Sequence, residues 1–337
     1  MNMGDEIVKK NKYEIDMCNG SIMDKLISFS LPLMLSGILQ LMFNAVDIVV
    51  VGRFSGSQAL AAVGSTTALI NVFTNLFIGI SLGANVLAAR YYAAGKTKEM
   101  SETVHTAIAL ALVSGVAMAV IGVVFARGAL EIMGTPDDVI AKSTLYMRIY
   151  FCGMPFFMMY NYGAAILRAV GDTKRPLIFL IVSGVINAVL NLFLVIGFHL
   201  DVAGVGIATV ISQLVSCILV LRCLHHTESS YQLHLAKLRI RSVYLKQIFE
   251  VGVPAGIQST VINISNAMLQ SSVNSFGSIA MAGYTASNNT FGFLYVSVNS
   301  FTQACMSFTS QNYGVKKLKR MDRVLIDCMI LSIVVTL

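Results

Sequence analysis

The sequence contains little charge, no tryptophan and no paired cysteine motif. Charged residues make up 12% of the 337 residues and hydrophobic residues 56%, with a mean hydropathy of +0.73. Soluble domains carry about 25% charged residues, so this composition excludes a soluble enzyme, a disordered chain and a collagen-like fibre. The six cysteines form no CxxC pair, which argues against a disulfide framework or a zinc site.

Long apolar runs dominate the sequence instead. Runs of about 18 or more apolar residues are typical of membrane-spanning helices, and nine occur here, the ninth ending with the sequence. The predicted fold is therefore all-α, a polytopic membrane helix bundle. The predicted spans are residues 26–51, 59–92, 104–126, 143–168, 176–198, 203–222, 247–275, 279–312 and 322–337.

Lysine and arginine gather in the N-terminal tail and in every second loop between the predicted spans. Cytoplasmic loops of membrane proteins carry an excess of these residues. The alternation predicts a multi-pass protein of the cell (inner) membrane with a cytoplasmic N-terminus. It also supports the span count, because a missed helix would scramble the pattern. The net charge of +7 therefore indicates membrane topology rather than nucleic-acid binding.

A pattern in the first predicted span returns in the seventh. Pro32 and Asn44 have the same spacing as Pro254 and Asn266. We interpret this as an internal repeat of a six-helix lobe rather than chance similarity between apolar helices. Two such lobes need twelve helices, so we expect the sequence to be a truncated form of a longer transporter. The predicted organisation is a cytoplasmic tail (1–25), a first lobe (26–224), a cytoplasmic inter-lobe loop (225–246) and an incomplete second lobe of about three helices (247–337).

Asp47 is the acidic residue that lies well inside a predicted span. Counted from Lys25, it sits about 33 Å along a straight helix, in the outer half of the first span. An ionisable group there is costly unless it faces a cavity, a partner or a proton path. We interpret Asp47 as a cation-coupling site for H⁺ or Na⁺. The alternative is a carboxylate that reaches outward to Arg53. However, Arg53 is six residues away, and only residues three or four apart are neighbours on a helix surface.

Polar side chains on other spans could surround this carboxylate. Asn187 and Asn191, four residues apart on the fifth span, and Thr209 on the sixth are candidates for the ion-coupling site. Hydrogen bonding between helices is the simpler role for any one of these side chains. The candidates for a substrate cavity are Gln40, Asn44, Asn71 and Asn75 in the first lobe and Gln258, Asn263, Asn266 and Asn288 in the second.

Two prolines occupy equivalent positions in the repeat. Pro32 and Pro254 lie early in the first and seventh spans. Proline removes a backbone donor and bends a helix. Such bends could serve gating, or could be passive kinks of the kind membrane helices tolerate. Their pairing by the repeat favours gating.

A basic segment, LRAVGDTKRP at 167–176, joins the fourth and fifth spans. Gly171 can end a helix, Asp172 or Thr173 can cap the next one, and Pro176 suits its first turn. The segment lacks the GxxxxGK[ST] pattern of a phosphate-binding loop. It also lacks the GxGD motif of an intramembrane protease.

Four of these features together resemble one known family. They are the spacing from Pro32 to Asp47, the sequence VGR at 51–53, the sequence ALAA at 59–62 and the segment 167–176. In combination they resemble the multidrug and toxic compound extrusion (MATE) family, over essentially the whole chain. The resemblance implies two six-helix lobes around a V-shaped cavity, alternating access, and efflux of cationic or amphipathic compounds driven by inward H⁺ or Na⁺.

The resemblance also assigns roles to residues. Asp47 matches the family's coupling aspartate, and Asn187, Asn191 and Thr209 match positions around it. Many relatives have an aspartate where this chain has Asn191. Another subgroup carries a glutamate inside the seventh helix, where this chain has none. Asp47 is then the sole deep carboxylate, which favours H⁺, although amide and hydroxyl oxygens leave Na⁺ possible at Asp47.

An ion-coupled drug antiporter is the leading prediction, without a cofactor other than H⁺ or Na⁺. A lipid-linked saccharide flippase of the same broad superfamily is the alternative, although it would need a basic cavity, and Arg148 is the one deep basic candidate. An enzyme is disfavoured by the lack of a nucleophile pair, dyad or metal cluster, and an inactive remnant remains open. The expected partners are amphipathic small molecules and the bilayer, with no nucleic acid and no obligate protein partner.

Overall fold

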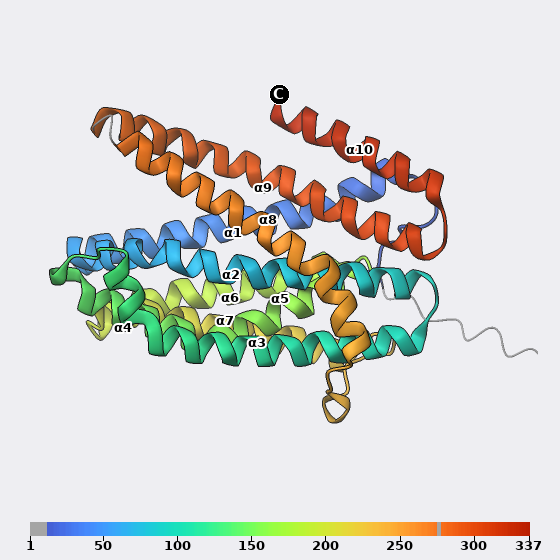
Figure 1. The fold of residues 1–337 in the computed structure, drawn as a ribbon, viewed down its shortest axis with the longest axis horizontal. Coiled ribbons are helices and arrows are strands. Elements are labelled where there is room, and N and C mark those ends of the chain that lie inside the picture. Colours follow the sequence, from blue (N-terminus) through green and yellow to red (C-terminus); the bar gives the residue numbers. More distant parts are fainter. Residues whose placement is uncertain (1–11, 275–277) are drawn as a thin grey trace, which may run out of the picture.

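The computed structural model describes residues 12–274 and 278–337, and over these residues the chain is helical without strands. The fold thus matches the predicted all-α helix bundle (Figure 1). The helices are α1 Ile22–Phe54, α2 Gly56–Ala93, α3 Thr97–Ile132, α4 Asp137–Cys152, α5 Met154–Ala169, α6 Lys174–Leu192 with a π-helical turn Phe193–Gly197, α7 Asp201–His225, a 3₁₀ turn Leu235–Lys237, α8 Ser242–Asn274, α9 Ser278–Gly314 and α10 Leu318–Thr336.

The fourth predicted span, residues 143–168, differs from the prediction of one helix. It is divided into α4 and α5 at Gly153. Pro155 has no N–H to donate to the carbonyl of Phe151, so the helical hydrogen bonding stops and restarts here. The side chain of Gln213 fills the break, because a Cβ on Gly153 would lie 2.5 Å from its Oε1 atom. A larger residue at 153 would collide with α7.

Helix length and polarity vary along the chain. Among the described helices, five are long and apolar enough to span a bilayer by length and composition, namely α1, α2, α3, α6 with its π-helical turn, and α7. The helices α4 and α5 have 16 residues each and share one predicted span. The longest, α2, has 38 residues, or about 57 Å at 1.5 Å per residue. It is longer than a hydrocarbon core of about 30 Å.

The helices form two bundles, which we call the first bundle (α1–α7) and the second bundle (α8–α10). The first bundle has a large apolar core, which runs from the end of α1 through α2 to α7 and also takes in Ile248 of α8. A smaller core joins Leu26 and Phe29 of α1 to Phe308 of α9 and Val324 of α10. The rings of Phe29 and Phe308 meet edge to face at 5.6 Å. The first half of α1 therefore packs on the second bundle.

The two bundles touch through glycines on α2 and α8. A Cβ on Gly79 would lie 2.2 Å from the Cα of Gly256, and one on Gly83 would lie 2.1 Å from the carbonyl oxygen of Ile248. A Cβ on Gly252 would lie 2.6 Å from a backbone atom of α2. Only glycine allows two helix backbones to approach this closely. Pro254 lies between Gly252 and Gly256, within this contact.

The bundles are joined at one end of the molecule and diverge toward the other. We call the joined end the basic end, because it carries the basic loop segments 94–96, 226–241 and 315–317. Toward the opposite end, α8 and α9 leave α1 and α2 at an angle (Figure 1). Apolar side chains of α8 such as Ile264 and Met268 are exposed there. The arrangement is a V that opens away from the basic end.

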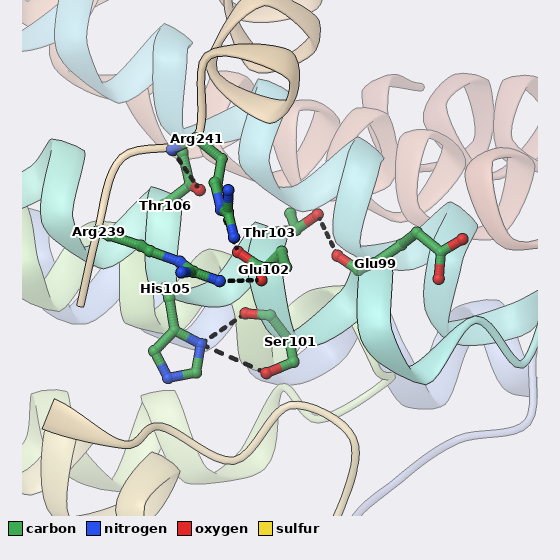
Figure 2. A network of polar contacts seen from close by, with 8 residues as sticks. All are labelled: Glu99, Ser101, Glu102, Thr103, His105, Thr106, Arg239 and Arg241. Atoms are coloured by element: carbon green, nitrogen blue, oxygen red, sulfur yellow. Dashed lines mark hydrogen bonds and ion pairs between the residues drawn. The ribbon is translucent and has the colours of Figure 1, made fainter. Parts of the chain in front are cut away.

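The loop between α7 and α8 is docked on α3 (Figure 2). Glu102 of α3 pairs with Arg239 at 2.6 Å and Arg241 at 3.2 Å. The backbone N–H of Arg241 also donates to Thr106 Oγ1 at 3.3 Å. The start of α8 is thereby held against the first bundle at the basic end.

Candidate functional site

Asp47 of α1 points toward α6. Asn191 Nδ2 donates a short hydrogen bond to Asp47 Oδ1. The side chain of Asn191 is fully buried, and Asp47 is half-buried. The two helices come close because Gly184 of α6 faces the ring of Phe43, one turn before Asp47. A Cβ on Gly184 would lie 1.9 Å from this ring.

The contact with Asp47 continues as a line of hydrogen bonds from α6 to α7. Asn191 Nδ2 also donates to Asn187 Oδ1 at 3.2 Å, and Asn187 Nδ2 donates to Thr209 Oγ1 at 3.5 Å. Thr209 Oγ1 donates to the carbonyl of Val205 at 2.9 Å. The structure thus brings together the four residues predicted for the ion-coupling site. Asn191 is the member of this line that donates to the carboxylate, while Asn187 donates away from it to Thr209, and a donated amide hydrogen suits an ionised acceptor.

Arg53, the alternative partner of Asp47, is exposed. Within the described part of the chain the two residues form no ion pair. A buried charge without a partner is costly, so the hydrogen bond from Asn191 is the contact that stabilises Asp47 in the protein interior.

A cavity of about 340 Å³ opens beside Asp47 inside the first bundle. Its walls come from α1, α2 and α4 to α7 and combine amide, hydroxyl and aromatic side chains. A site of this kind can hold a flat organic molecule while fixing its orientation through a few polar groups. The lining residues are Gln40, Phe43, Asn44, Asp47, Asn71, Thr74, Asn75, Ile78, Tyr146, Tyr150, Phe157, Tyr160, Asn161, Leu180, Ser183, Gly184, Asn187, Thr209, Ser212, Gln213 and Ser216.

The cavity residues predicted in the first bundle all border this space. Gln40, Asn44, Asn71 and Asn75 line it together with Asp47. Asn75 Nδ2 donates to the Asn71 carbonyl at 2.7 Å, which leaves its amide oxygen and its second N–H for a ligand.

The cavity residues predicted in the second bundle lie elsewhere. Gln258, Asn266 and Asn288 are exposed, and Asn263 is half-buried. None of them borders the cavity around Asp47. Asn263 Nδ2 donates to the Ser259 carbonyl of its own helix at 2.8 Å. The structure therefore does not bring these four side chains into the polar cavity.

Several cavity residues were not predicted. Tyr146 and Tyr150 lie four residues apart on α4, and Tyr160 and Asn161 lie on α5. Tyr160 donates from its hydroxyl to the Pro176 carbonyl at 3.2 Å. The four-residue spacing of the two α4 tyrosines was the available signal, since it puts both rings on one helix face.

The two prolines predicted for gating lie inside continuous helices. Pro32 is buried in α1, and Ser36 Oγ donates to its carbonyl at 2.8 Å. Pro254 is exposed on α8 at the glycine contact with α2. Each leaves the carbonyl four residues earlier without its helical donor, so each marks a point where its helix bends most easily.

The MatE family model matches residues 32–193 and 254–337. The chain belongs to the MatE family. The two matched segments of this MatE chain begin at Pro32 and Pro254, the residues that align in the internal repeat.

Curated relatives and solved structures agree with the MatE assignment. The chain is 33% identical over 304 residues to the probable multidrug resistance protein YoeA of Bacillus subtilis, covering 88% of this chain and 66% of YoeA. It is 25% identical over 307 residues to the probable multidrug resistance protein YpnP of the same organism, covering 90% of this chain and 68% of YpnP. The fold is similar to that of a multidrug resistance MATE transporter in its outward-facing conformation, with a TM-score of 0.90, 20% identity, and coverage of 97% of this chain and 73% of that chain.

The MatE chain therefore spans about two thirds of the length of these curated relatives. Members of the family are multi-pass membrane transporters, and the apolar helices fit that class. The likeness to the solved structure shows the fold alone, because the identity is low.

Proposed function

We propose that this chain exports cationic or amphipathic compounds across the cell membrane in exchange for H⁺ bound at Asp47. The observation that carries the proposal is the Asp47 carboxylate, which lies inside the polar cavity and accepts a hydrogen bond from Asn191. Among the described residues lining the cavity, Asp47 is the one charged side chain. The basic loops support an orientation with the basic end and the N-terminus in the cytoplasm.

Competition between the proton and the cationic cargo for Asp47 would couple proton entry to cargo export. An ionised Asp47 attracts a cationic cargo, and the aromatic walls supply faces on which a cation or a ring can stack. A proton arriving from the outer side neutralises the carboxylate and removes that attraction, so the cargo leaves. The same proton is given up after the cavity turns toward the cytoplasm.

The contacts of Asp47 favour H⁺ over Na⁺. A sodium ion needs several oxygen ligands, whereas Asn191 turns its NH₂ group toward the carboxylate. Thr209 donates to a backbone carbonyl, which leaves its oxygen only partly available. The amide of Asn191 can donate to Asp47 both when the carboxyl is ionised and when it is protonated, because a protonated carboxyl still has an oxygen that accepts a hydrogen bond.

Replacing Asp47 by asparagine tests the proposal. In proteoliposomes or everted vesicles, an imposed pH gradient should drive uptake of a fluorescent organic cation by the parent chain but not by Asp47→Asn. The control is Asp322→Asn, an exposed carboxylate on α10, which should transport normally. Equal amounts of both variants in the membrane fraction would show that insertion is intact. Parent-level transport by Asp47→Asn would refute the coupling role, and transport driven only by a Na⁺ gradient would replace H⁺ by Na⁺.

A further inference from the structure

Residues 13–20 form an extended segment before α1 that lies across the basic ends of both bundles. We call this segment the strap. It makes no regular secondary structure. Its first residues contact the first bundle, and its last residues contact the second. The strap is therefore a connection between the bundles that is separate from the glycine contact of α2 and α8.

The first bundle holds the strap mainly through Glu14. Tyr92 of α2 donates from its hydroxyl to Glu14 Oε2 at 2.7 Å. Tyr231, in the loop between α7 and α8, donates to Glu14 Oε1 at 2.6 Å. The backbone N–H of Ile15 donates to the carbonyl of Gly171 at 3.3 Å. Hydrogen bonds to an ionised acceptor are about twice as strong as neutral ones, so the carboxylate dominates this attachment.

The segment 167–176 builds the surface on which the strap rests. Gly171 has a φ of +95°, and a Cβ there would lie 2.5 Å from the carbonyl oxygen of Ile15. Asp172 accepts a hydrogen bond from the Arg175 N–H at 3.1 Å and pairs with its guanidinium. Arg175 Nη2 in turn donates to the Tyr231 hydroxyl at 3.4 Å. Burial and the nearby Glu14 carboxylate raise the pKa of Tyr231, which keeps its hydroxyl protonated as a donor.

The second bundle holds the strap by burial as well as by hydrogen bonds. Met17 is fully buried in the smaller core with α9 and α10. Its carbonyl accepts from Asn312 Nδ2 and Arg320 Nε, both at 3.2 Å. Lys317 Nζ donates to the Cys18 carbonyl at 2.9 Å. The strap then continues into the half of α1 that packs on the same bundle. These contacts make the strap a fixed part of the second bundle.

The two attachments thus differ in kind, since one is a buried side chain with several backbone contacts, while the other combines the two hydrogen bonds to Glu14 with the single Ile15–Gly171 hydrogen bond and the stacking of Arg175 on Tyr13. We propose that the strap is a latch that holds the basic ends of the two bundles together, and that Glu14 must leave Tyr92 and Tyr231 before the basic end opens. The inference rests on the proposed transport, which requires the cavity to face each side in turn. It goes further by naming the contact that is released.

A cysteine placed between the bundles can report this opening without any transport. Ser307 of α9 is 1% exposed, and its Oγ donates to Asn85 Oδ1 of α2 at 3.1 Å. We would introduce Ser307→Cys into a chain whose six native cysteines are replaced by alanine. The rate of reaction with a maleimide then measures how often the basic end opens.

Glu14→Ala in this background should raise the labelling rate roughly a hundredfold, because it removes two hydrogen bonds to a charged group and each is worth about tenfold. The matched control is Glu228→Ala, an exposed carboxylate in the loop between α7 and α8, which should leave the rate unchanged. The double variant Tyr92→Phe/Tyr231→Phe keeps the rings and the carboxylate but removes both donors. It should reproduce the effect, and adding Glu14→Ala to it should give no further increase.

An unchanged labelling rate in both Glu14→Ala and the double tyrosine variant would overturn the latch, as would an equal increase in Glu228→Ala. Gel filtration of each variant shows whether it is folded, and the tyrosine variant keeps the test valid if Glu14→Ala is not. Faster labelling in a chain that moves no cargo would support the latch while refuting the proposed function, so the two failures are distinguishable.

Discussion

The glycine contact between α2 and α8 predicts opposite effects for two similar substitutions. A Cβ on Gly79 would lie 2.2 Å from the Cα and 2.4 Å from the N of Gly256. Carbon atoms in ordinary contact are about 3.5–4.0 Å apart, so Gly79→Ala must push two backbones apart by more than about 1 Å. Overpacking of this kind costs about 1–3 kcal/mol. Gly64, also in α2, has nothing within 4 Å of its Cβ position.

Alanine stabilises a helix interior relative to glycine by about 0.5–1 kcal/mol. We therefore expect Gly64→Ala to raise the free energy of unfolding slightly and Gly79→Ala to lower it, a difference of about 2 kcal/mol or more. Thermal unfolding of the purified variants in one detergent, followed by far-UV circular dichroism, measures the order. Equal midpoints for the two variants, or a higher midpoint for Gly79→Ala, would refute a backbone contact between the bundles.

Two further substitutions test the polar cavity and the end of the molecule opposite the strap. Gly184→Ala would place a methyl group 1.9 Å from the Phe43 ring, which should turn that ring into the cavity and weaken the binding of an organic cation, measured by fluorescence titration. Adding Phe43→Leu to the same chain should restore binding. Unchanged binding by Gly184→Ala alone would contradict this. Lys142→Ala removes a 2.7 Å ion pair with Asp201 whose side chains are about one third exposed. It should lower the unfolding free energy by less than about 1 kcal/mol, and a larger loss would show that the pair is more strongly coupled than its exposure indicates.

Most of the fold could be predicted from hydropathy and charge, because a segment in a bilayer must satisfy its backbone groups internally, and a long apolar run does so as a helix. The first span, predicted at 26–51, is α1 at Ile22–Phe54. The break at Gly153 could not be predicted from hydropathy, because residues 143–168 form one continuous apolar run that covers most of α4 and α5. The Pro155 that follows was the local signal. The strap was missed because residues 13–20 have no hydrophobic period from which a structure could be inferred.

The polar groups around Asp47 could be predicted only in part. The four-residue spacing of Asn187 and Asn191 predicts a common face, and the structure joins that face to Asp47. The second set of amides was equally prominent in the sequence but does not border the cavity. An asparagine in a membrane helix can satisfy its donor on its own backbone, as Asn263 does with Ser259 and Asn161 does with Phe157. Composition alone does not distinguish these cases.

The cavity beside Asp47 takes its whole described lining from the first bundle, which limits how a bound molecule can act. A molecule bound there does not contact the second bundle. It therefore cannot hold the two bundles together by binding to both of them. A ligand shifts a conformational balance only by its unequal affinity for the alternatives. The difference in affinity between the two conformations must then depend on α1 and α2, because these helices line the cavity on one face and contact the second bundle on another. We therefore expect a bound molecule to act on the second bundle through the helices α1 and α2, and not by direct contact with both bundles.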